Sequence, residues 1–228
     1  MKNFKNYSND IYHIAIDGPV ASGKGTVAKR LASRLSIPAL DTGAMYRAVA
    51  VWMMEGGVDV TNPSEVEFAC AELNMEVNIV DGKTIVFINE GNYTEKIRDN
   101  RVSQAASDIS LYPCVRNYLT NLQQEIAKTQ SFILEGRDIS SVVLPDAKFK
   151  FYLTASVEKR AERRHKELIA KGMRITIEEV ITQIKHRDAQ DSTRDIAPLI
   201  KVKDAIIVDN SELTIDGTLD KMLEQIHG

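Results

Sequence analysis

A glycine-rich segment near the start of the chain holds residues that could bind phosphate. Residues 18–26 read GPVASGKGT and directly follow an apolar run at residues 11–16, and a helical pattern begins near Lys24. Glycines allow a tight loop whose backbone N–H groups converge on phosphate oxygens, and the N-terminus of a helix adds positive potential. Lys24 can reach the β- and γ-phosphates, so the segment predicts a P-loop that binds a nucleoside triphosphate. The predicted contacts are Gly18, Pro19, Val20, Ala21, Ser22, Gly23, Lys24, Gly25 and Thr26.

One position of this loop departs from the usual pattern. Gly25 stands between Lys24 and the hydroxyl residue, so we expect Thr26 to lie near a Mg²⁺ ion carried by ATP. A purely structural glycine-rich turn is the alternative interpretation. A P-loop alone does not distinguish a kinase from a GTPase switch, a motor or an ATP-driven regulator. The guanine motif N-K-x-D is absent, and extra arginine clusters favour transfer to a second bound anion.

The segment DTGAMYR, residues 41–47, places a hydroxyl, an aromatic ring and a guanidinium within about one helical turn. These groups belong to Thr42, Tyr46 and Arg47. Arginine can bind a phosphate through two parallel hydrogen bonds, so Arg47 is a candidate for the second anion. A capped helix with a packed tyrosine and a solvated arginine is the alternative.

Two further groups of charged residues lie downstream. Arg137 and Asp138 follow the apolar run at residues 132–134, which places them at the C-terminal end of a buried strand, the edge where open α/β sheets bind ligands. Arg187, Asp191 and Arg194 are spaced by four and three residues. They share one face if the helix continues. Surface ion pairs are the alternative interpretation of both groups.

The elements that must position these residues follow from the apolar patterns. Apolar runs without alternation indicate strands buried on both faces, so we expect a parallel sheet flanked by helices, an α/β core. The predicted strands lie at residues 11–16, 132–134, 148–153 and 205–208. Helical periodicity covers residues 27–35, 115–126 and 219–226.

Two other segments have sequence patterns that do not fit a parallel sheet flanked by helices. Residues 76–79 and 84–88 flank an Asp-Gly turn, which predicts an antiparallel hairpin. Strands joined so tightly cannot be successive strands of a parallel core, so residues 61–101 are interpreted as an inserted subdomain. A helical hairpin is expected at residues 158–190, where Thr176 and Glu179 have the spacing of a capping box.

Composition limits the class of protein. The 228 residues are 43% hydrophobic and 27% charged, which is typical of a single globular domain. The start is polar, and no stretch approaches the roughly 18 apolar residues of a membrane span, so we expect a cytoplasmic protein. A net charge of −3 argues against binding to nucleic acid polymers or anionic membranes. Cys70 and Cys114 do not have the spacing of a metal site or a redox motif. We also expect the protein to be a monomer.

Taken together, the motifs resemble those of the bacterial cytidylate kinases, which are P-loop nucleoside monophosphate kinases. The motifs occur in the order of that family and span nearly the whole chain. They are IDGP at residues 16–19, GKGT at 23–26, DTGAMYR at 41–47, EGRD at 135–138, VVLPD at 142–146, and Arg187, Asp188, Asp191 and Arg194 before APL at 197–199.

The resemblance implies one domain over residues 1–228, with residues 61–101 binding the acceptor and residues 158–190 forming a lid. It implies transfer of the γ-phosphoryl group of ATP, with Mg²⁺, to CMP and dCMP in pyrimidine nucleotide metabolism. The implied acceptor-phosphate ligands are Arg47, Arg137 and Arg194, with Thr42 and Tyr46 in the same pocket. The implied sugar ligands are Arg187 and Asp191, and the implied cytosine ligands are Ser107, Arg116 and Asp138. The implied lid arginines facing ATP phosphates are Arg160, Arg163 and Arg164, and the implied catalytic residues are Lys24, Arg137, Arg194, Arg163 and Arg164.

Two positions differ from the family pattern. Ser140 and Ser141 stand where relatives often have Gly-Thr, and Thr42 stands where many have Ser. An ionised phosphate acceptor needs no strong general base, so none is assigned. The alternatives that remain are an adenylate, uridylate or shikimate kinase, or a nucleotide-binding regulator without turnover.

Overall fold

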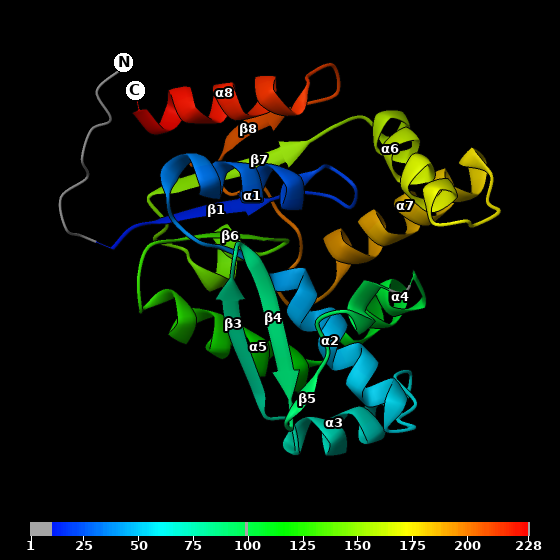
Figure 1. Cartoon of the computed structure of the whole chain (residues 1–228). Coiled ribbons are helices and arrows are strands. Elements are labelled where there is room, and N and C mark those ends of the chain that lie inside the picture. The colour runs from blue at the N-terminus through cyan, green and yellow to red at the C-terminus, as the bar shows by residue number, and fades with distance from the viewer. Residues whose placement is uncertain (1–10, 99, 228) are drawn as a thin grey trace.

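The computed structural model describes residues 11–98 and 100–227 and contains a five-stranded parallel sheet in the order β2-β6-β1-β7-β8. Helices cover both faces of this sheet (Figure 1), as the apolar runs predict. The strands are β1 (His13–Asp17), β2 (Ala39–Asp41), β6 (Phe132–Gly136), β7 (Phe149–Thr154) and β8 (Ile206–Asp209). The flanking helices are α1 (Lys24–Leu35), α2 (Thr42–Glu55), α5 (Pro113–Ala127) and α8 (Ile215–His227).

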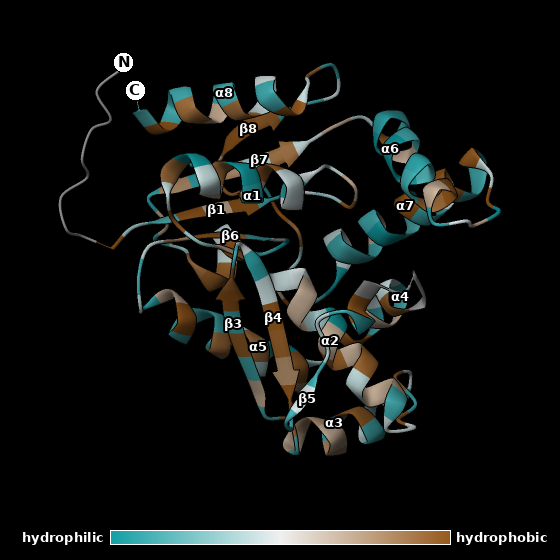
Figure 2. Cartoon of the chain, in the orientation of Figure 1, coloured by the Kyte–Doolittle hydropathy of each residue, from teal (hydrophilic) through white to brown (hydrophobic). Residues whose placement is uncertain are grey.

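Strand β1 shows why its sequence does not alternate. Ile14 and Ile16 pack among residues of α1 and α8, whereas Ala15 packs among residues of α2 and α5. All three side chains are fully buried, because both faces of a parallel sheet are covered. Figure 2 shows the same pattern as brown strands between helices that are teal on their outer sides.

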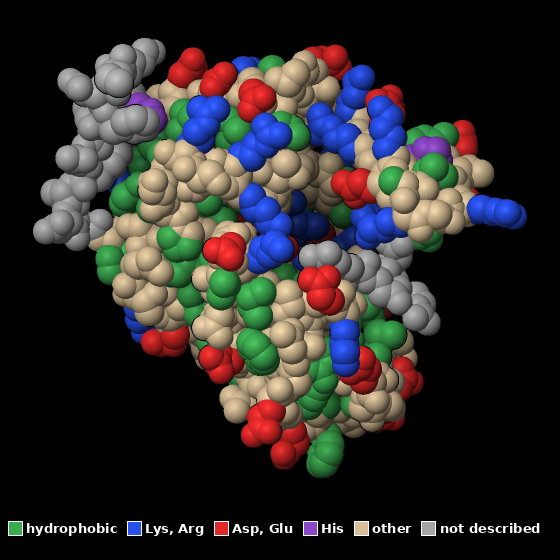
Figure 3. Space-filling view, viewed as in Figure 1, with side chains coloured by type: hydrophobic (Ala, Val, Ile, Leu, Met, Phe, Trp, Pro, Cys, Tyr) green, Lys and Arg blue, Asp and Glu red, His purple; other side chains and the backbone are tan. Residues whose placement is uncertain are grey.

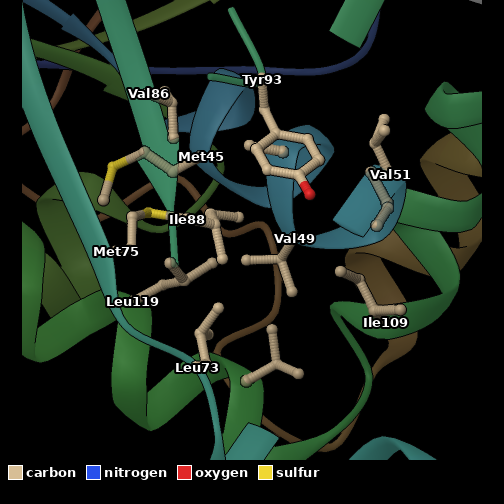
Figure 4. Close-up of a cluster of buried hydrophobic side chains, with 14 of the residues drawn as sticks. Met45, Val49, Val51, Leu73, Met75, Val86, Ile88, Tyr93, Ile109 and Leu119 are labelled. Atoms are coloured by element: carbon tan, nitrogen blue, oxygen red, sulfur yellow. The ribbon is translucent and has the colours of Figure 1, made fainter. Parts of the chain in front are cut away.

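The predicted hairpin is confirmed as the antiparallel pair β3 (Met75–Val80) and β4 (Lys83–Ile88), and a short β5 (Gly91–Asn92) extends it. Asp81 and Gly82 both have positive φ, 51° and 70°, as the turn of a two-residue hairpin requires. This small sheet has no core of its own. Its buried residues Val86 and Ile88 belong to the cluster that includes α2 and α5 (Figure 4).

Four more α-helices lie in the described part of the chain. Helix α3 (Pro63–Ala71) precedes the small sheet, and α4 (Asn100–Ile109) follows it and the turn η1 (Lys96–Arg98). Helices α6 (Val157–Ala170) and α7 (Ile177–Thr193) form the predicted helical hairpin, and the capping box of Thr176 and Glu179 is present. These two helices share a small apolar cluster of Ala161, Leu168, Val180 and Ile184.

A few boundaries differ from the predictions. Strand β1 begins at His13 instead of residue 11, and the short strand β2 was not predicted, because three residues carry too little pattern to detect. Helix α7 ends at Thr193, and Arg194 has an extended ψ of 146°. Arg194 therefore follows the helix that carries Arg187 and Asp191. Among the described helices, none has the length and apolar character of a membrane span.

Candidate active site

The glycine-rich loop joins β1 to α1, and its backbone is set by close packing. A Cβ atom at Gly18 would lie 2.0 Å from the backbone oxygen of Leu153 on β7, so no other residue fits there. Gly23 has a φ of 89° and precedes α1, which begins at Lys24. The ammonium group of the buried Lys24 donates hydrogen bonds to the Pro19 carbonyl, 2.9 Å away, and to the Ser22 hydroxyl, 3.4 Å away.

A cavity of about 670 Å³ opens over the C-terminal ends of the strands in front of this loop. In the sheet, Asp17 is paired with Gly136, and Asp41 is paired with Glu135. The loop after β1, the segment after β6 and the start of α2 therefore meet at one edge, as expected for ligand sites in open α/β sheets. Figure 3 shows Lys and Arg side chains gathered around the hollow at this edge. Its predicted lining residues are Val20, Ala21, Ser22, Gly23, Lys24, Gly25, Thr26, Thr42, Tyr46, Arg47, Ser107, Arg116, Arg137, Asp138, Arg163, Arg164, Arg187, Asp191 and Arg194.

Three residues predicted to contact ATP do not line the cavity, namely Gly18, Pro19 and Arg160. The case of Arg160 corrects the expectation that it faces the phosphates. Its guanidinium is buried behind the loop, where it donates to the Val20 carbonyl at 3.0 Å and pairs with Asp188 at 2.6 Å. Asp188 also accepts a hydrogen bond from the Val20 N–H at 3.1 Å. Arg160 therefore holds the loop from behind.

Gly25, the position that departs from the usual loop pattern, faces Glu135. A Cβ atom at Gly25 would lie 3.2 Å from Glu135 Oε1, so a larger residue would press on this carboxylate. Burial, with Asp41 nearby, raises the pKa of Glu135 to about 7. Burial also lowers the pKa of Lys24 to about 7, and the positive charge of Arg137 adds to that shift.

The same corner fits a magnesium ion carried by ATP. The Thr26 residue lines the cavity beside Gly25, and the carboxylates of Asp41 and Glu135 lie at the same edge. Within the described residues no group of three or more His, Cys, Asp or Glu side chains is placed to hold a metal ion. Mg²⁺ in nucleotide sites keeps several waters and is bound by phosphates with one or two protein oxygens. Thr26 and Glu135 supply oxygens of that kind.

Four arginines that line the cavity, called here the arginine group, are Arg47, Arg137, Arg187 and Arg194. Asp191 pairs with Arg137 at 2.8 Å and lies 3.7 Å from Arg194. Arg47 pairs with Asp41 at 3.0 Å.

The arginine group has unused donors. Arg187 Nε and Arg194 Nη2 are buried without a hydrogen-bond partner in the described part of the chain. Burial and the charge of Arg137 lower the pKa of Arg187 to about 10. A buried donor without a hydrogen bond lowers the stability of the folded protein. This end of the cavity is therefore arranged to receive an anion that accepts from these donors.

A second set of buried side chains, called here the Arg116–Asp138 group, comprises Ser107, Ser110, Arg116 and Asp138. Arg116 forms an ion pair with Asp138, and both side chains are at least 90% buried. The Tyr46 ring lies against Arg116, with 5.6 Å between the ring centre and Cζ. Burial raises the pKa of Tyr46 to about 12. This group offers fixed hydrogen-bonding atoms next to the arginine group.

Ser140, the first position that differs from the family pattern after Asp138, is hydrogen-bonded to the end of β1. The Asp17 carboxylate at the end of β1 accepts hydrogen bonds from the Ser140 hydroxyl and from the N–H groups of Ile139 and Ser140, both at 2.8 Å. These bonds hold the π-helical turn η2 (Ile139–Val143). The serine therefore joins the segment after Asp138 to the strand that leads into the P-loop. Thr42, the other departure, donates its hydroxyl to the Glu135 carbonyl at 2.7 Å.

The arginines of α6 differ in their partners. Arg163 donates to Asn210 through two hydrogen bonds, 2.9 Å to Oδ1 and 2.7 Å to the backbone oxygen. Arg164 pairs with Glu167 at 3.1 Å. Asn210 in turn donates to the Ser22 carbonyl at 3.0 Å. Arg163 is thus linked to the P-loop through Asn210.

Sequence reasoning missed several residues of the site. Glu135 and Asp188 lie inside two of the motifs, but the sequence pattern indicates a role only for their neighbours Arg137, Asp138 and Arg187. Asn210 follows β8 and carried no recognisable signal. A further wall of the cavity lies after β8 and comprises Asn210, Leu213, Thr214, Ile215 and Thr218.

A parallel sheet whose first strand leads into a glycine-rich phosphate loop, beside a second arginine-lined pocket, defines a P-loop phosphotransferase. The model of one protein family, cytidylate kinase, matches residues 14–228. The chain is 47% identical over 213 residues to the cytidylate kinase of Thermosipho melanesiensis, which covers 93% of this chain and 95% of the relative. It is 45% identical over 215 residues to that of Thermotoga neapolitana, with 94% and 96% covered. This chain belongs to the cytidylate kinase family.

A solved structure supports the fold. An uncharacterized protein from Eubacterium ventriosum superposes with a TM-score of 0.51 at 14% identity, covering 95% of this chain and 98% of the other. At that identity the likeness concerns the arrangement of helices and strands alone.

Proposed function

We propose that this protein transfers the γ-phosphoryl group of ATP to CMP and dCMP, which gives CDP or dCDP and ADP. The observation that carries the proposal is a single cavity that joins the P-loop, the arginine group and the Arg116–Asp138 group. The P-loop suits the phosphates of ATP. Within the arginine group, Arg47, Arg137 and Arg194 suit the phosphate of the acceptor, and Arg187 with Asp191 suits its sugar hydroxyls.

The Arg116–Asp138 group supports a cytosine base. Arg116 donates to Asp138 Oδ2, and Asp138 Oδ1 lies 3.9 Å from Arg194 Nη2, beyond hydrogen-bond distance. A carboxylate oxygen accepts a hydrogen bond from the exocyclic amine of cytosine, as it does in the grooves of DNA. The corresponding atom of uracil is an oxygen, which offers no proton. The group therefore favours CMP over UMP.

Catalysis follows from alignment and charge. Phosphoryl transfer leaves little covalent chemistry for the protein, so positioning and neutralisation of charge dominate. Lys24 and the N-terminus of α1 stabilise charge on the donor phosphates, and Arg137 and Arg194 hold the acceptor phosphate in line. Mg²⁺, when bound with ATP, neutralises charge on the β- and γ-phosphates. The acceptor phosphate is already ionised, so no general base is required.

We also propose that α6 and α7 close over the bound nucleotides and bring Arg163 and Arg164 to the ATP phosphates. Closure would exclude water, which otherwise competes with CMP as the acceptor. The small sheet formed by β3, β4 and β5 would belong to the acceptor side of the molecule. The cytoplasmic location and the monomeric state stay predictions from the sequence.

An assay of ADP release with Mg-ATP tests the proposal across CMP, dCMP, UMP, AMP and shikimate. We expect CMP and dCMP to have the highest kcat/KM. Lys24→Ala should abolish transfer while circular dichroism stays that of the folded protein, because this lysine contributes charge to the site. Preferred turnover of another acceptor, or nucleotide binding without turnover of any acceptor, would contradict the proposal.

A further inference from the structure

Helix α7 contacts the Arg116–Asp138 group through a residue that does not itself line the cavity. Gln190 on α7 reaches Ser107 on α4, and two hydrogen bonds join them. The Ser107 hydroxyl lies 3.1 Å from Gln190 Oε1, and Gln190 Nε2 lies 3.4 Å from the Ser107 carbonyl oxygen. Ser107 lines the cavity, whereas Gln190 is behind it.

These two bonds determine the direction of the Ser107 hydroxyl proton. A backbone carbonyl can only accept, so the amide NH₂ of Gln190 must face the Ser107 carbonyl oxygen. The amide oxygen then faces the Ser107 hydroxyl, which must donate its proton to Gln190. A hydroxyl has one proton and two lone pairs. With its proton committed to Gln190, Ser107 can act only as an acceptor toward a ligand in the cavity.

The rest of the group holds this arrangement in place. The Ser107 carbonyl also accepts from the Ser110 hydroxyl at 2.7 Å, and Arg116 donates to the Ser110 carbonyl at 3.0 Å. The same guanidinium binds Asp138. Both lone pairs of the Ser107 carbonyl are therefore used, one by the Ser110 hydroxyl and one by the Gln190 amide. The Ser107 hydroxyl oxygen and the Asp138 carboxylate are then both acceptors toward a ligand.

We propose that Gln190 is a positioning residue that turns Ser107 into a hydrogen-bond acceptor and so strengthens the preference for a pyrimidine that carries an exocyclic amine. The inference rests on the proposed function, because it takes a pyrimidine nucleotide as the acceptor. Gln190 acts through Ser107 and makes no contact with the nucleotide. Its effect therefore falls on discrimination between CMP and UMP, and it leaves the transfer step itself intact.

The test compares kcat/KM for CMP and UMP in Gln190→Met, which keeps the length of the side chain and removes its hydrogen bonds. We expect the CMP to UMP ratio to fall by about fivefold or more, the effect of freeing one hydrogen bond to a polar ligand group. The kcat with CMP should stay near that of the unaltered protein. Calorimetric binding of CMP and UMP should show the same change in the ratio of Kd values. Gln183→Met, on the exposed side of the same helix, is the matched control.

Two further variants separate the proposed role from a structural one. Gln190→Lys offers only donors, so Ser107 would turn its proton toward the cavity and the ratio should fall further. In a Ser107→Ala background, Gln190→Met should have no additional effect. An unchanged ratio in Gln190→Met, or an equal fall in the Ser107→Ala background, overturns the inference. Failure of the unaltered protein to use CMP would instead overturn the proposed function.

Discussion

At the scale of single residues, the site consists of charged side chains that are buried in opposite pairs. Arg116 with Asp138 and Arg137 with Asp191 are held at hydrogen-bond distance with little exposure. A buried charge without a partner raises the free energy of the folded state. Each member of such a pair therefore keeps the other in position. The pairs keep the side chains in place before a nucleotide arrives, which reduces the cost of ordering them on binding.

Asp138→Asn tests recognition of the base. The amide oxygen can still accept from Arg116, and its NH₂ group can then donate to the oxygen of uracil. Loss of one matched hydrogen bond corresponds to roughly 1–3 kcal/mol, so the CMP to UMP ratio of kcat/KM should fall by at least about tenfold. Both substrates are measured with both proteins. An unchanged ratio would show that Asp138 does not read the base and would leave Ser107 and Arg116 as candidates.

Glu135→Gln tests the pH dependence of stability. The pKa of Glu135 is raised from 4.5 to about 7, chiefly by burial, so the folded state binds more protons than the unfolded state between these values. Its stabilising contribution is complete below pH 4.5 and is lost as the pH rises through about 7. From about pH 5 to about pH 8 the free energy of unfolding should therefore fall more in the unaltered protein than in Glu135→Gln.

Urea denaturation at both pH values measures this difference. Glu125→Gln removes an exposed carboxylate on α5 and is the control, which should behave like the unaltered protein. A parallel pH response of the unaltered protein and Glu135→Gln would refute the assignment of the raised pKa to Glu135.

At the scale of elements, α7 connects the two halves of the cavity. Within one turn, Asp188 binds the P-loop at Val20, and Asp191 binds Arg137 after β6. Gln190 binds Ser107 on α4. Positions three apart share a helix face, which is why Asp188 and Asp191 both point toward the sheet edge. A movement of this helix would therefore be transmitted to the donor loop and to the acceptor pocket.

Asp188→Asn tests the connection between α7 and the P-loop. The amide keeps one acceptor but presents NH₂ to either Arg160 or the Val20 N–H, so one partly buried donor loses its partner. We expect the free energy of unfolding to fall by about 1–3 kcal/mol. The KM for ATP should rise while the KM for CMP is nearly unchanged. Asp195→Asn, an exposed carboxylate just after α7, is the control, and an equal rise in both KM values would argue for a general loss of structure.

At the scale of the whole molecule, three apolar clusters meet around the cavity. One joins the small sheet to α2, α4 and α5, and another joins the parallel sheet to α1 and α8. The third is the small cluster of α6 and α7. Among the described residues outside that hairpin, only Val20 and Ala21 of the P-loop pack against it as partly buried apolar neighbours. A unit with so small an apolar contact to the rest is suited to move, because few packed contacts must be broken.

Hydrogen exchange of backbone amides tests this movement. We expect exchange in residues 157–193 to slow strongly when CMP and a non-hydrolysable ATP analogue are both bound, because closure buries these helices against the nucleotides. Either nucleotide alone should have a smaller effect. The core strands β1 and β6 are the internal reference. Equal protection by CMP alone would place α6 and α7 on the acceptor side and contradict their role as a lid over ATP.

The sequence by itself determined the features that depend on neighbouring residues. Local backbone geometry and continuous apolar runs suffice for these features, which are the glycine positions of the P-loop, the Asp-Gly hairpin turn, the capping box at Thr176 and the location of Arg137 after β6. The resemblance to the family added which arginines to consider, and most of them line one cavity. Features that depend on residues close together in the sequence could therefore be predicted.

Only the tertiary structure decided which way each side chain points and which distant residues it meets. Arg160 and Arg164 are four residues apart on one helix, yet Arg160 is buried behind the P-loop and Arg164 lines the cavity. Ser140 and Asp17 are 123 residues apart, and Ser107 and Gln190 are 83 apart. Such pairs form because sheet order and helix packing bring their backbones together, and a pattern of neighbouring residues contains no information about that approach.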